Sequence, residues 1–252
     1  MTFHALHQQE SPLVLANIWD VPSAQAVQKL PFQAMGTSSA AVAASMGYAD
    51  GEAFPFEQLE ERVRQITNSS TLPLSVDIEG GYSRDPDEIA EHILRLAELG
   101  VVGINLEDSV VSAQRELLEA STFAKTIERV REQLSAQGAV PFLNIRTDTY
   151  LLRLADAAPE TQRRIRLYEE AGADGIFIPC ITQPADIEAA VAATSLPINV
   201  MCMPDLPNFA TLQQLGVKRI SMGNFLFEKM YESLAQLSQS LLSSGSFELV
   251  FA

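Results

Sequence analysis

Histidine, lysine and cysteine are scarce in this 252-residue sequence, and each scarcity argues against a class of catalytic site. The three histidines, His4, His7 and His92, lie in the N-terminal segment or in an expected helix. A histidine general base or a histidine-rich zinc site is therefore not predicted. A Schiff-base aldolase needs a lysine at the carboxyl end of a strand. All four lysines lie elsewhere in the expected structure: Lys29, Lys125, Lys218 and Lys229.

The two cysteines, Cys180 and Cys202, show no metal-binding spacing, and we expect partly buried, inert thiols in a reducing cytoplasm. No apolar run approaches the roughly 20 residues that span a bilayer. The N-terminus lacks a basic start followed by an apolar stretch, so a signal peptide is not expected. Basic residues number 17 against 32 acidic ones, which gives a formal net charge of −15. Such an excess repels phosphate backbones and argues against nucleic-acid binding.

Short apolar or β-branched runs alternate with amphipathic stretches of helical length along the chain. Several helical patterns, at 55–70, 85–100, 121–138 and 183–194, begin after Asp or Pro or end at Gly, as helices prefer. Regular alternation of this kind predicts a parallel sheet. The strand-like runs are 13–20, 33–39, 73–80, 102–109, 141–148, 174–180, 197–202 and 219–224.

Eight such units in about 250 residues are typical of a (β/α)8 barrel. The alternative is an open, doubly wound sheet, but no G-x-G-x-x-G turn follows the first strand-like run. No Ser/Gly-rich linker or change of composition marks a second domain. The sequence therefore predicts one barrel domain over residues 1–252.

Polar residues gather at the carboxyl ends of the strand-like runs, whereas the runs begin with apolar or neutral residues. Active-site residues of such barrels collect at the carboxyl ends of the strands. Residues two apart on a strand share a face. Three pairs are therefore predicted to point into the barrel mouth: Asp77 with Glu79, Asn105 with Glu107, and Asn144 with Arg146.

This centre would contain at least three carboxylates and one guanidinium, and its carboxylates supply only oxygen ligands. Oxygen ligands suit a hard cation, Mg²⁺ or Mn²⁺, and Arg146 can bind a substrate carboxylate through two hydrogen bonds. Other strand-end residues have simpler explanations that stay open. Asp20, Asp108 and Asp148 can cap a helix or pair with a surface arginine, and Trp19 belongs either to the core or to a pocket wall.

The stretch SVDIEGGY, residues 75–82, combines the carboxylate pair with two glycines. The carboxylates of Asp77 and Glu79 are predicted to form a metal pair. Gly80 and Gly81 predict a pliable backbone that lets the following loop close over a ligand.

Six motifs resemble, in order and spacing, those of the isocitrate lyase/phosphoenolpyruvate mutase superfamily: NIWDVPSA, GTSSAAVAASMGYADG, SVDIEGGYS, GVVGINLEDS, NIRTDTY and AGADGIFIP. The resemblance covers about residues 13 to 230. It implies a modified (β/α)8 barrel whose eighth helix, here at about 225–245, packs against a neighbouring subunit in a homodimer or homotetramer. It also implies that Mg²⁺ and an α-keto acid or its enolate are bound.

The same resemblance implies a set of metal-binding residues. Asp77 and Glu79 match the D-x-D metal pair, and Glu107 matches a glutamate that reaches the metal directly or through water. Asp50 matches an aspartate near the metal and the substrate. This chain has Glu79 where the family has a second aspartate, which adds a methylene and moves the metal or inserts a water.

Substrate-binding residues are implied in the same way. Ser38 and Ser39 match a Ser-Gly pair whose backbone amides and hydroxyl hold the substrate carboxylate or oxyanion; plain turn residues are the alternative explanation for both. Ser39 in place of Gly restricts the approach of the backbone. Arg146 matches the arginine that binds the substrate carboxylate. Trp19 and Asn199, at the ends of two strand-like runs, are further candidates for substrate contact.

The segment after the fourth strand departs from the best-known relatives. Isocitrate and methylisocitrate lyases carry K-[KR]-C-G-H there, and phosphoenolpyruvate mutases carry K-T-N. The sequence EDSVVSAQRELLEAS, at 107–121, contains neither motif. Pro179 stands where the mutase and its hydrolase relatives have a histidine.

These features together predict a Mg²⁺-dependent lyase that cleaves a C–C bond beside the carbonyl of a small α-keto or α-hydroxy (di)carboxylic acid. Decarboxylation of an oxaloacetate-like substrate or a pyruvate-forming retro-aldol cleavage fits best, through a metal-stabilised enolate. Tyr48, Tyr82 and a metal-bound water are the candidate proton donors. Two alternatives stay open: C–P bond chemistry, as in phosphonomutases or phosphonopyruvate hydrolases, and a carboxylate-binding barrel without turnover.

Overall fold

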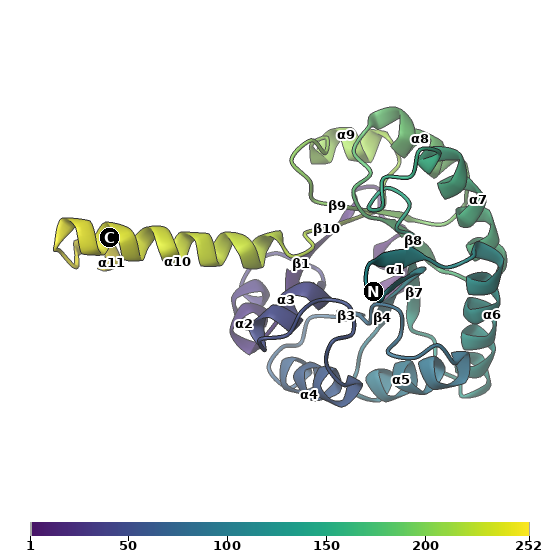
Figure 1. Ribbon diagram of the computed structural model, residues 1–252, viewed down its shortest axis with the longest axis horizontal. Coiled ribbons are helices and arrows are strands. Elements are labelled where there is room, and N and C mark those ends of the chain that lie inside the picture. Colours follow the sequence, from purple (N-terminus) through teal and green to yellow (C-terminus); the bar gives the residue numbers. More distant parts are fainter. Residues whose placement is uncertain (1, 252) are drawn as a thin grey trace.

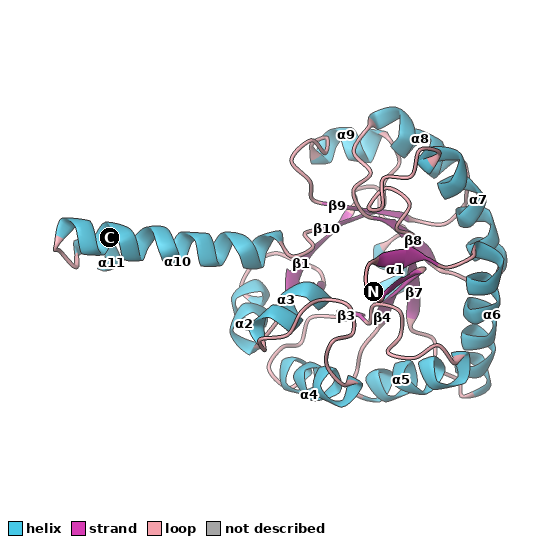
Figure 2. Cartoon of the chain, in the orientation of Figure 1, coloured by secondary structure: helices cyan, strands magenta, loops and turns pink. Residues whose placement is uncertain are grey.

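A computed structural model describes residues 2–251 and contains a closed barrel of eight parallel strands with helices outside it (Figures 1 and 2). The (β/α)8 prediction is therefore confirmed. Strand order around the barrel is β1-β10-β9-β8-β7-β4-β3-β2, so every barrel strand has two neighbours. The barrel strands are β1 (Leu13–Ile18), β2 (Met35–Thr37), β3 (Leu74–Asp77), β4 (Gly103–Glu107), β7 (Phe142–Arg146), β8 (Gly175–Ile178), β9 (Ile198–Met201) and β10 (Arg219–Ser221).

Most of the helices form the outer ring, and several begin at residues whose side chains cap free N–H groups. Asp20 and Ser23 form a reciprocal capping box at α2, Asp85 caps α5 just before Pro86, and Asn208 caps α9. The helices are α1 (Phe3–Leu6), α2 (Val21–Gln28), α3 (Ser39–Ser45), α4 (Phe56–Thr67), α5 (Pro86–Glu98), α6 (Ala120–Ala136), α7 (Ala157–Glu170), α8 (Pro184–Ala192), α9 (Phe209–Gln214), α10 (Phe225–Ser244) and α11 (Glu248–Phe251).

The chain beyond β3 differs from the expected strand. β3 ends at Asp77, and Glu79 has a φ of 53°, in the left-handed region that costs a non-glycine residue free energy. Asp77 and Glu79 therefore do not share a strand face. Gly81 has a φ of 98°, and a Cβ there would lie 2.7 Å from Ile89 Cγ1 of α5. The glycine pair thus forms a closely packed turn. The prediction of a pliable backbone at Gly80 and Gly81 is therefore wrong.

Helix α1 covers the amino end of the barrel and lies across the ring in Figure 1. Phe3 and Leu6 pack with Leu13 and other residues at the starts of the strands. His7 stacks on Phe142, with ring centroids 4.1 Å apart and planes 9° from parallel. The amino end is therefore filled by side chains and sealed.

Arg219, the first residue of β10, contradicts the expectation that strands begin with apolar or neutral residues. It is only 2% exposed and donates from Nη2 to Ser75 Oγ at 3.2 Å and to Asn105 Oδ1 at 3.3 Å. Asn144 joins Asn105 and Asn199 through its Nδ2, at 2.9 and 3.0 Å. The middle of the barrel thus contains a polar layer.

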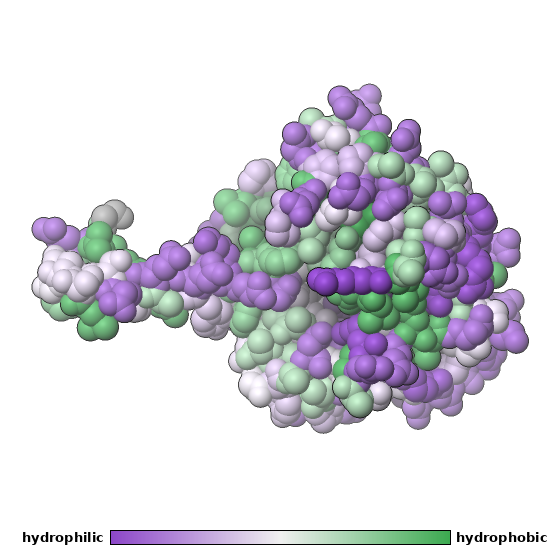
Figure 3. Space-filling model, turned by 45° about the horizontal axis from the view of Figure 1, so that its top comes forward, coloured by the Kyte–Doolittle hydropathy of each residue, from purple (hydrophilic) through white to green (hydrophobic). Residues whose placement is uncertain are grey.

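Two elements lie outside the regular pattern. An antiparallel hairpin, β5 (Ser109–Val111) with β6 (Arg115–Leu117), follows β4. Helix α10 projects from the barrel, and apolar and polar side chains alternate along it in Figure 3. Within residues 2–251, no helix has both the length and the apolar character needed to cross a membrane.

Candidate active site

The carboxyl ends of the barrel strands surround a cavity of about 280 Å³. It lies at the opposite end of the barrel from α1, where the loops after β2, β4 and β7 converge. Short polar side chains, carboxylates and guanidiniums all reach its wall. Those that carry the argument below are Ser38, Ser39, Asp50, Asp77, Arg115 and Arg146.

Asp77, the last residue of β3, is fixed by hydrogen bonds with three residues. Its backbone N–H donates to Thr37 Oγ1 of β2 at 2.8 Å. Its Oδ2 accepts the hydroxyl of Ser39 at 3.0 Å, and its Oδ1 accepts the backbone N–H of Glu79 at 3.3 Å. The side chain is therefore held at the cavity wall in one orientation.

Ser38 and Ser39 come directly after β2, where the strand changes into α3. Ser38 Oγ accepts the N–H of Ala41 and caps the helix, while the N–H of Ser38 donates to Ile18 O at 3.2 Å. The Ser39 N–H points to Asp77 Oδ2 at 3.4 Å. The structure thus brings both serines to the cavity, with their amides directed to partners within the protein.

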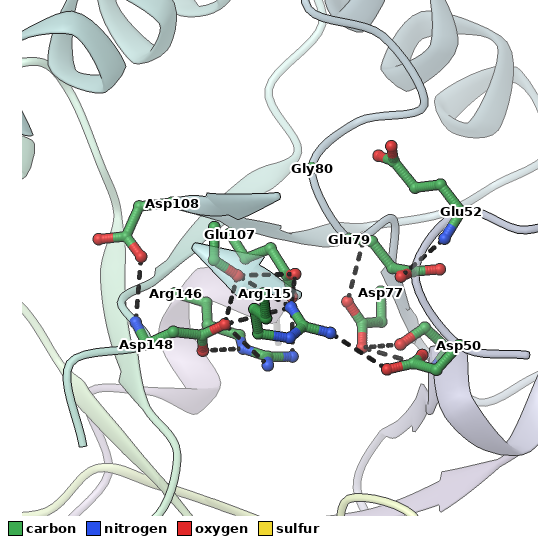
Figure 4. A network of polar contacts seen from close by, with 12 residues as sticks. Asp50, Glu52, Asp77, Glu79, Gly80, Glu107, Asp108, Arg115, Arg146 and Asp148 are labelled. Atoms are coloured by element: carbon green, nitrogen blue, oxygen red, sulfur yellow. Dashed lines mark hydrogen bonds and ion pairs between the residues drawn. The ribbon is translucent and has the colours of Figure 1, made fainter. Parts of the chain in front are cut away.

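Glu79 is 2% exposed and lies beside Asp77 in Figure 4. Its Oε2 accepts the backbone N–H of Glu52 at 3.0 Å. Glu52 is itself held by the N–H of Tyr82 at 2.7 Å and by Arg84. Among the described residues, Glu79 Oε1 is buried without a hydrogen-bond partner. Such an atom is costly to bury and indicates a missing ligand.

Arg146, at the end of β7, lies between two buried carboxylates. Its Nε donates to Asp148 Oδ1 at 2.6 Å and its Nη2 to Asp148 Oδ2 at 3.2 Å, while its Nη1 lies 2.9 Å from Glu107 Oε2. Five N–H bonds belong to a guanidinium, so two remain for a ligand in the cavity. Glu107 and Asp148 thereby orient Arg146.

Arg115 is a functional candidate that the sequence reasoning missed. It extends from β6 of the hairpin and joins carboxylates on both sides of the site (Figure 4). Its Nη1 is paired with Glu107 Oε1 and lies 3.3 Å from Asp148 Oδ2, while its Nη2 lies 3.2 Å from Asp50 Oδ2. The side chain is 17% exposed, so most of it lies within the site.

Burial and mutual repulsion raise the pKa values of the Glu79 and Asp77 carboxyl groups. Burial raises the pKa of Glu79 to about 8, and the nearby charges of Asp50 and Asp77 add to the rise. Burial also raises the pKa of Asp77, an effect that Arg146 opposes. Acidic groups outnumber basic groups at this end. Five carboxylates share the site with two guanidiniums: Asp50, Asp77, Glu79, Glu107 and Asp148 with Arg115 and Arg146.

The donor chemistry fits a divalent cation. All the candidate ligands are carboxylate oxygens, acidic groups outnumber basic groups in the site, and one buried oxygen of Glu79 is unsatisfied among the described residues. In this conformation, however, no group of three or more His, Cys, Asp or Glu side chains within residues 2–251 is arranged to hold a metal ion. Arg115 already contacts Glu107, one of the three predicted metal ligands, and Asp50, which is predicted to lie near the metal.

Six predicted site residues do not line the cavity: the buried Glu79 and Glu107, and Tyr48, Tyr82, Trp19 and Asn199. Tyr48 is 39% exposed, and its hydroxyl accepts from Gln58 Nε2 at 3.4 Å. The Tyr82 hydroxyl is buried, and its ring packs on Phe54. Neither phenol is therefore placed to donate a proton in the cavity. Trp19 packs on Phe227 of α10 and belongs to the core. Asn199 lies in the polar layer in the middle of the barrel, below the cavity, and donates to Val200 O and Ser221 Oγ.

The strand-end residues with open explanations divide into two groups. Asp20 caps α2, and buried Asp108 is bound by Arg164 Nη1 and the Tyr168 hydroxyl, both at 2.8 Å, so these two are structural. Asp148 belongs to the site through Arg146. Cys180 and Cys202 are partly buried, and burial raises the pKa of the Cys180 thiol.

Comparisons with known proteins agree with this architecture. The profile of the family described as phosphoenolpyruvate phosphomutase matches residues 3–242. An uncharacterized protein of Mycobacterium tuberculosis strain H37Rv is 40% identical over 230 residues, covering 89% of this chain and 82% of that protein. An oxaloacetate decarboxylase of Paraburkholderia xenovorans is 28% identical over 250 residues, covering 96% of this chain and 81% of that protein. A Burkholderia cenocepacia J2315 crystal structure, described provisionally as a phosphonomutase, matches with a TM-score of 0.89 and 37% identity, covering 94% of this chain and 97% of that chain.

Proposed function

Because the chain belongs to the phosphoenolpyruvate phosphomutase family, within the isocitrate lyase/phosphoenolpyruvate mutase superfamily, we propose that it is a divalent-cation-dependent carbon–carbon lyase. Its substrate would be a small α-keto or α-hydroxy (di)carboxylic acid cleaved beside its carbonyl, as in oxaloacetate decarboxylation or a pyruvate-forming retro-aldol reaction. Similarity to an oxaloacetate decarboxylase supports this choice.

One observation carries the proposal: Arg146 and Asp77 reach the same cavity wall from opposite sides of a carboxylate cluster. Arg146 is held by Glu107 and Asp148, and its two remaining N–H bonds can bind a substrate carboxylate. Fixing that carboxylate aligns the breaking bond with the carbonyl π-system. A guanidinium and an acidic cluster beside one small cavity suit an anionic substrate that is bound together with a cation.

Asp77 and Glu79, with Asp50 and Glu107, would hold the cation. A bound Mg²⁺ or Mn²⁺ supplies a positive charge that stabilises an enolate oxygen. Ser39 orients Asp77 through its hydroxyl, and Glu52 orients Glu79 through its backbone N–H. Phe177 and Met201 form an apolar part of the cavity wall.

A substrate panel tests this proposal. Oxaloacetate, 2-methylmalate-type adducts and phosphonopyruvate are each incubated with the protein and Mg²⁺, and pyruvate, CO₂, aldehyde and phosphate are measured. Free Mg²⁺ can itself promote oxaloacetate decarboxylation, so Asp77→Asn with the same Mg²⁺ serves as the matched control. We expect pyruvate from a C–C substrate at a rate well above that of Asp77→Asn. Equal rates for the two proteins with every substrate would contradict the proposal.

A second candidate function is C–P bond chemistry, because a structure described provisionally as a phosphonomutase is 37% identical to this chain. The same panel separates the two functions. Phosphate released from phosphonopyruvate, or conversion of phosphonopyruvate to an enol phosphate, would favour C–P chemistry. Binding of oxalate with Mg²⁺ but no turnover would favour the carboxylate-binding barrel.

The proposal includes assembly into a homodimer or homotetramer through α10. This helix exposes an apolar stripe, formed by Leu226, Met230, Leu234 and Leu237. An apolar cavity of about 630 Å³ lies beside β10, and Leu206, Phe209 and Met222 contribute to its wall. A second copy of the chain can bury both surfaces, whereas a lone copy leaves both in water.

A further inference from the structure

The β5–β6 hairpin places its own cation inside the proposed active site. Arg115 is the only lysine or arginine between residues 109 and 119. Its guanidinium lies 2.9 Å from Ser109 Oγ and is paired with Glu107, Asp148 and Asp50. These carboxylates come from three separate parts of the barrel end, so a single side chain joins them.

The position of Arg115 coincides with that of the cation in the proposed function. Asp50 and Glu107 are two of the four carboxylates that would hold Mg²⁺ or Mn²⁺, and Arg115 contacts both. A guanidinium and a divalent ion repel each other strongly at contact distance. They also compete for the same oxygen lone pairs. The two cations therefore exclude each other between these carboxylates.

The hairpin depends on this contact for its position over the site. Val111 of β5 packs against the Asp50–Gly51 turn, where a Cβ on Gly51 would lie 2.8 Å from Val111 Cβ. After β6, the N–H of Leu118 donates to Asp108 O at 2.8 Å. The polar side-chain contacts of the hairpin to the barrel end come from Ser109, at the start of β5, and from Arg115. Release of Arg115 therefore loosens the hold of the hairpin on the barrel end, leaving the contacts of Val111, Ser109 and Leu118.

We propose that Arg115 is an exchangeable internal cation that occupies the carboxylate cluster until a divalent cation displaces it, so that cation binding and loosening of the hairpin are coupled. This inference rests on the proposed function, because it takes the divalent cation from it. The coupling keeps the carboxylates neutralised while no metal is bound. It also makes the hairpin respond to the metal before a substrate enters.

Manganese affinity measured by calorimetry tests the competition. Arg115→Gln removes the competing charge, so the Kd for Mn²⁺ should fall at least about fivefold, within the usual range of coupling between sites. Arg129→Gln is the matched control, because it removes the same charge. Arg129 lies on α6 and forms exposed ion pairs with Glu132 of that helix and with Asp87 of α5. The Mn²⁺ affinity of Arg129→Gln should equal that of the wild type. An unchanged or weaker affinity in Arg115→Gln would overturn the proposal.

Hydrogen exchange of the wild-type protein gives a second readout that needs no variant. Coupling is reciprocal, so a cation that displaces Arg115 must also loosen the hairpin. Amides of residues 109–118 should exchange faster with saturating Mn²⁺ than with EDTA, while those of α6 stay unchanged. Slower or equal exchange in the hairpin would overturn the proposal.

A further variant distinguishes failure of this inference from failure of the proposed function. Asp77→Asn removes a carboxylate that Arg115 does not contact, so loss of Mn²⁺ binding in this variant supports the proposed cation site whatever Arg115 does. If the wild type and Arg115→Gln both fail to bind Mn²⁺, the cation site and the exchange are both refuted. If both bind equally, only the exchange is refuted.

Discussion

The two ends of the barrel bury ionisable side chains in opposite ways. At the amino end, burial lowers the pKa of His7 to about 3, and the nearby charge of Arg219 adds to that effect. Burial also lowers the pKa of Arg219, whose Nε and Nη1 lack partners among the described residues. At the carboxyl end, carboxylates gather around two guanidiniums and a cavity.

This difference indicates that the amino end contributes mainly to stability and the carboxyl end mainly to function. At the amino end, His7 is uncharged at neutral pH and packs against aromatic rings. Packing therefore determines its contribution to the free energy of unfolding. The carboxyl end holds its two guanidiniums in ion pairs with carboxylates, and its acidic groups outnumber its basic ones. Retaining such charges costs free energy, which is the usual condition of a barrel active site.

The largest effect is expected from removing the ring that seals the amino end. Phe142 is 2% exposed and contacts the rings of Phe3, His4 and His7. Phe142→Ala should lower the free energy of unfolding by about 3–5 kcal/mol, as measured by urea denaturation. The Mn²⁺ affinity of the folded variant should match that of the wild type. A large loss of Mn²⁺ affinity would contradict the claim that the amino end affects stability and not cation binding.

The pH dependence of stability is the next largest effect. His7 binds a proton more readily in the unfolded chain, where its pKa is near 6.5, than in the folded protein, where its pKa is about 3. Stability from a neutral His7 is therefore complete above pH 6.5 and declines as the pH falls toward 3. At pH 4.5 the loss should be about 3 kcal/mol. His7→Phe should flatten this part of the curve of unfolding free energy against pH, whereas an unchanged slope would contradict a buried, neutral His7.

A smaller effect is expected at the turn that supports Glu79. Gly81→Ala adds a Cβ 2.7 Å from Ile89 Cγ1 at a φ of 98°, so both overlap and backbone strain oppose it. Gly100→Ala is the matched control, because Gly100 has a φ of 90° with no atom within 4 Å of the added Cβ. Gly81→Ala should cost about 1–3 kcal/mol more than the control in thermal unfolding. Equal losses would mean that the turn is not tightly packed.

The smallest effect on the stability of the single chain is expected on α10. Leu234 is 56% exposed and lies in the apolar stripe of that helix. Leu234→Glu should change the unfolding free energy by less than about 0.5 kcal/mol at concentrations where the chain is monomeric. At concentrations where the wild type forms the proposed assembly, Leu234→Glu should lower the mass measured by light scattering toward that of the monomer. Unchanged mass would argue against α10 as the contact between copies.

Much of the fold followed from local patterns. Alternating apolar runs and capped helices predicted the barrel, and the helix predicted at 85–100 forms as Pro86–Glu98. The positions of Asp77 and Arg146 at the carboxyl ends of strands also predicted that they share one cavity, because these ends meet at one end of a barrel.

The residues that were missed depend on contacts between distant parts of the chain. Arg115 was overlooked because its segment lacks the known motifs, and only the fold of the hairpin brings it within 3.2 Å of Asp50. Glu79 was placed on a strand face because nothing in the sequence shows that β3 ends at Asp77. Tyr48 and Tyr82 were candidate proton donors, but their rings pack on Phe54 and neither residue lines the cavity.

The central claim is that the carboxyl end of this barrel binds a divalent cation together with an enolate-like dianion. The most direct measurement is the unfolding temperature with Mn²⁺ and oxalate, separately and together, for the wild type and Asp77→Asn. At ligand concentrations near 100 times Kd, the wild type should unfold about 5 °C or more above the metal-free protein, and the two ligands together should exceed the sum of their separate shifts. Asp77→Asn should show no such combined shift. An equal shift in both proteins, or none in the wild type, would contradict the claim.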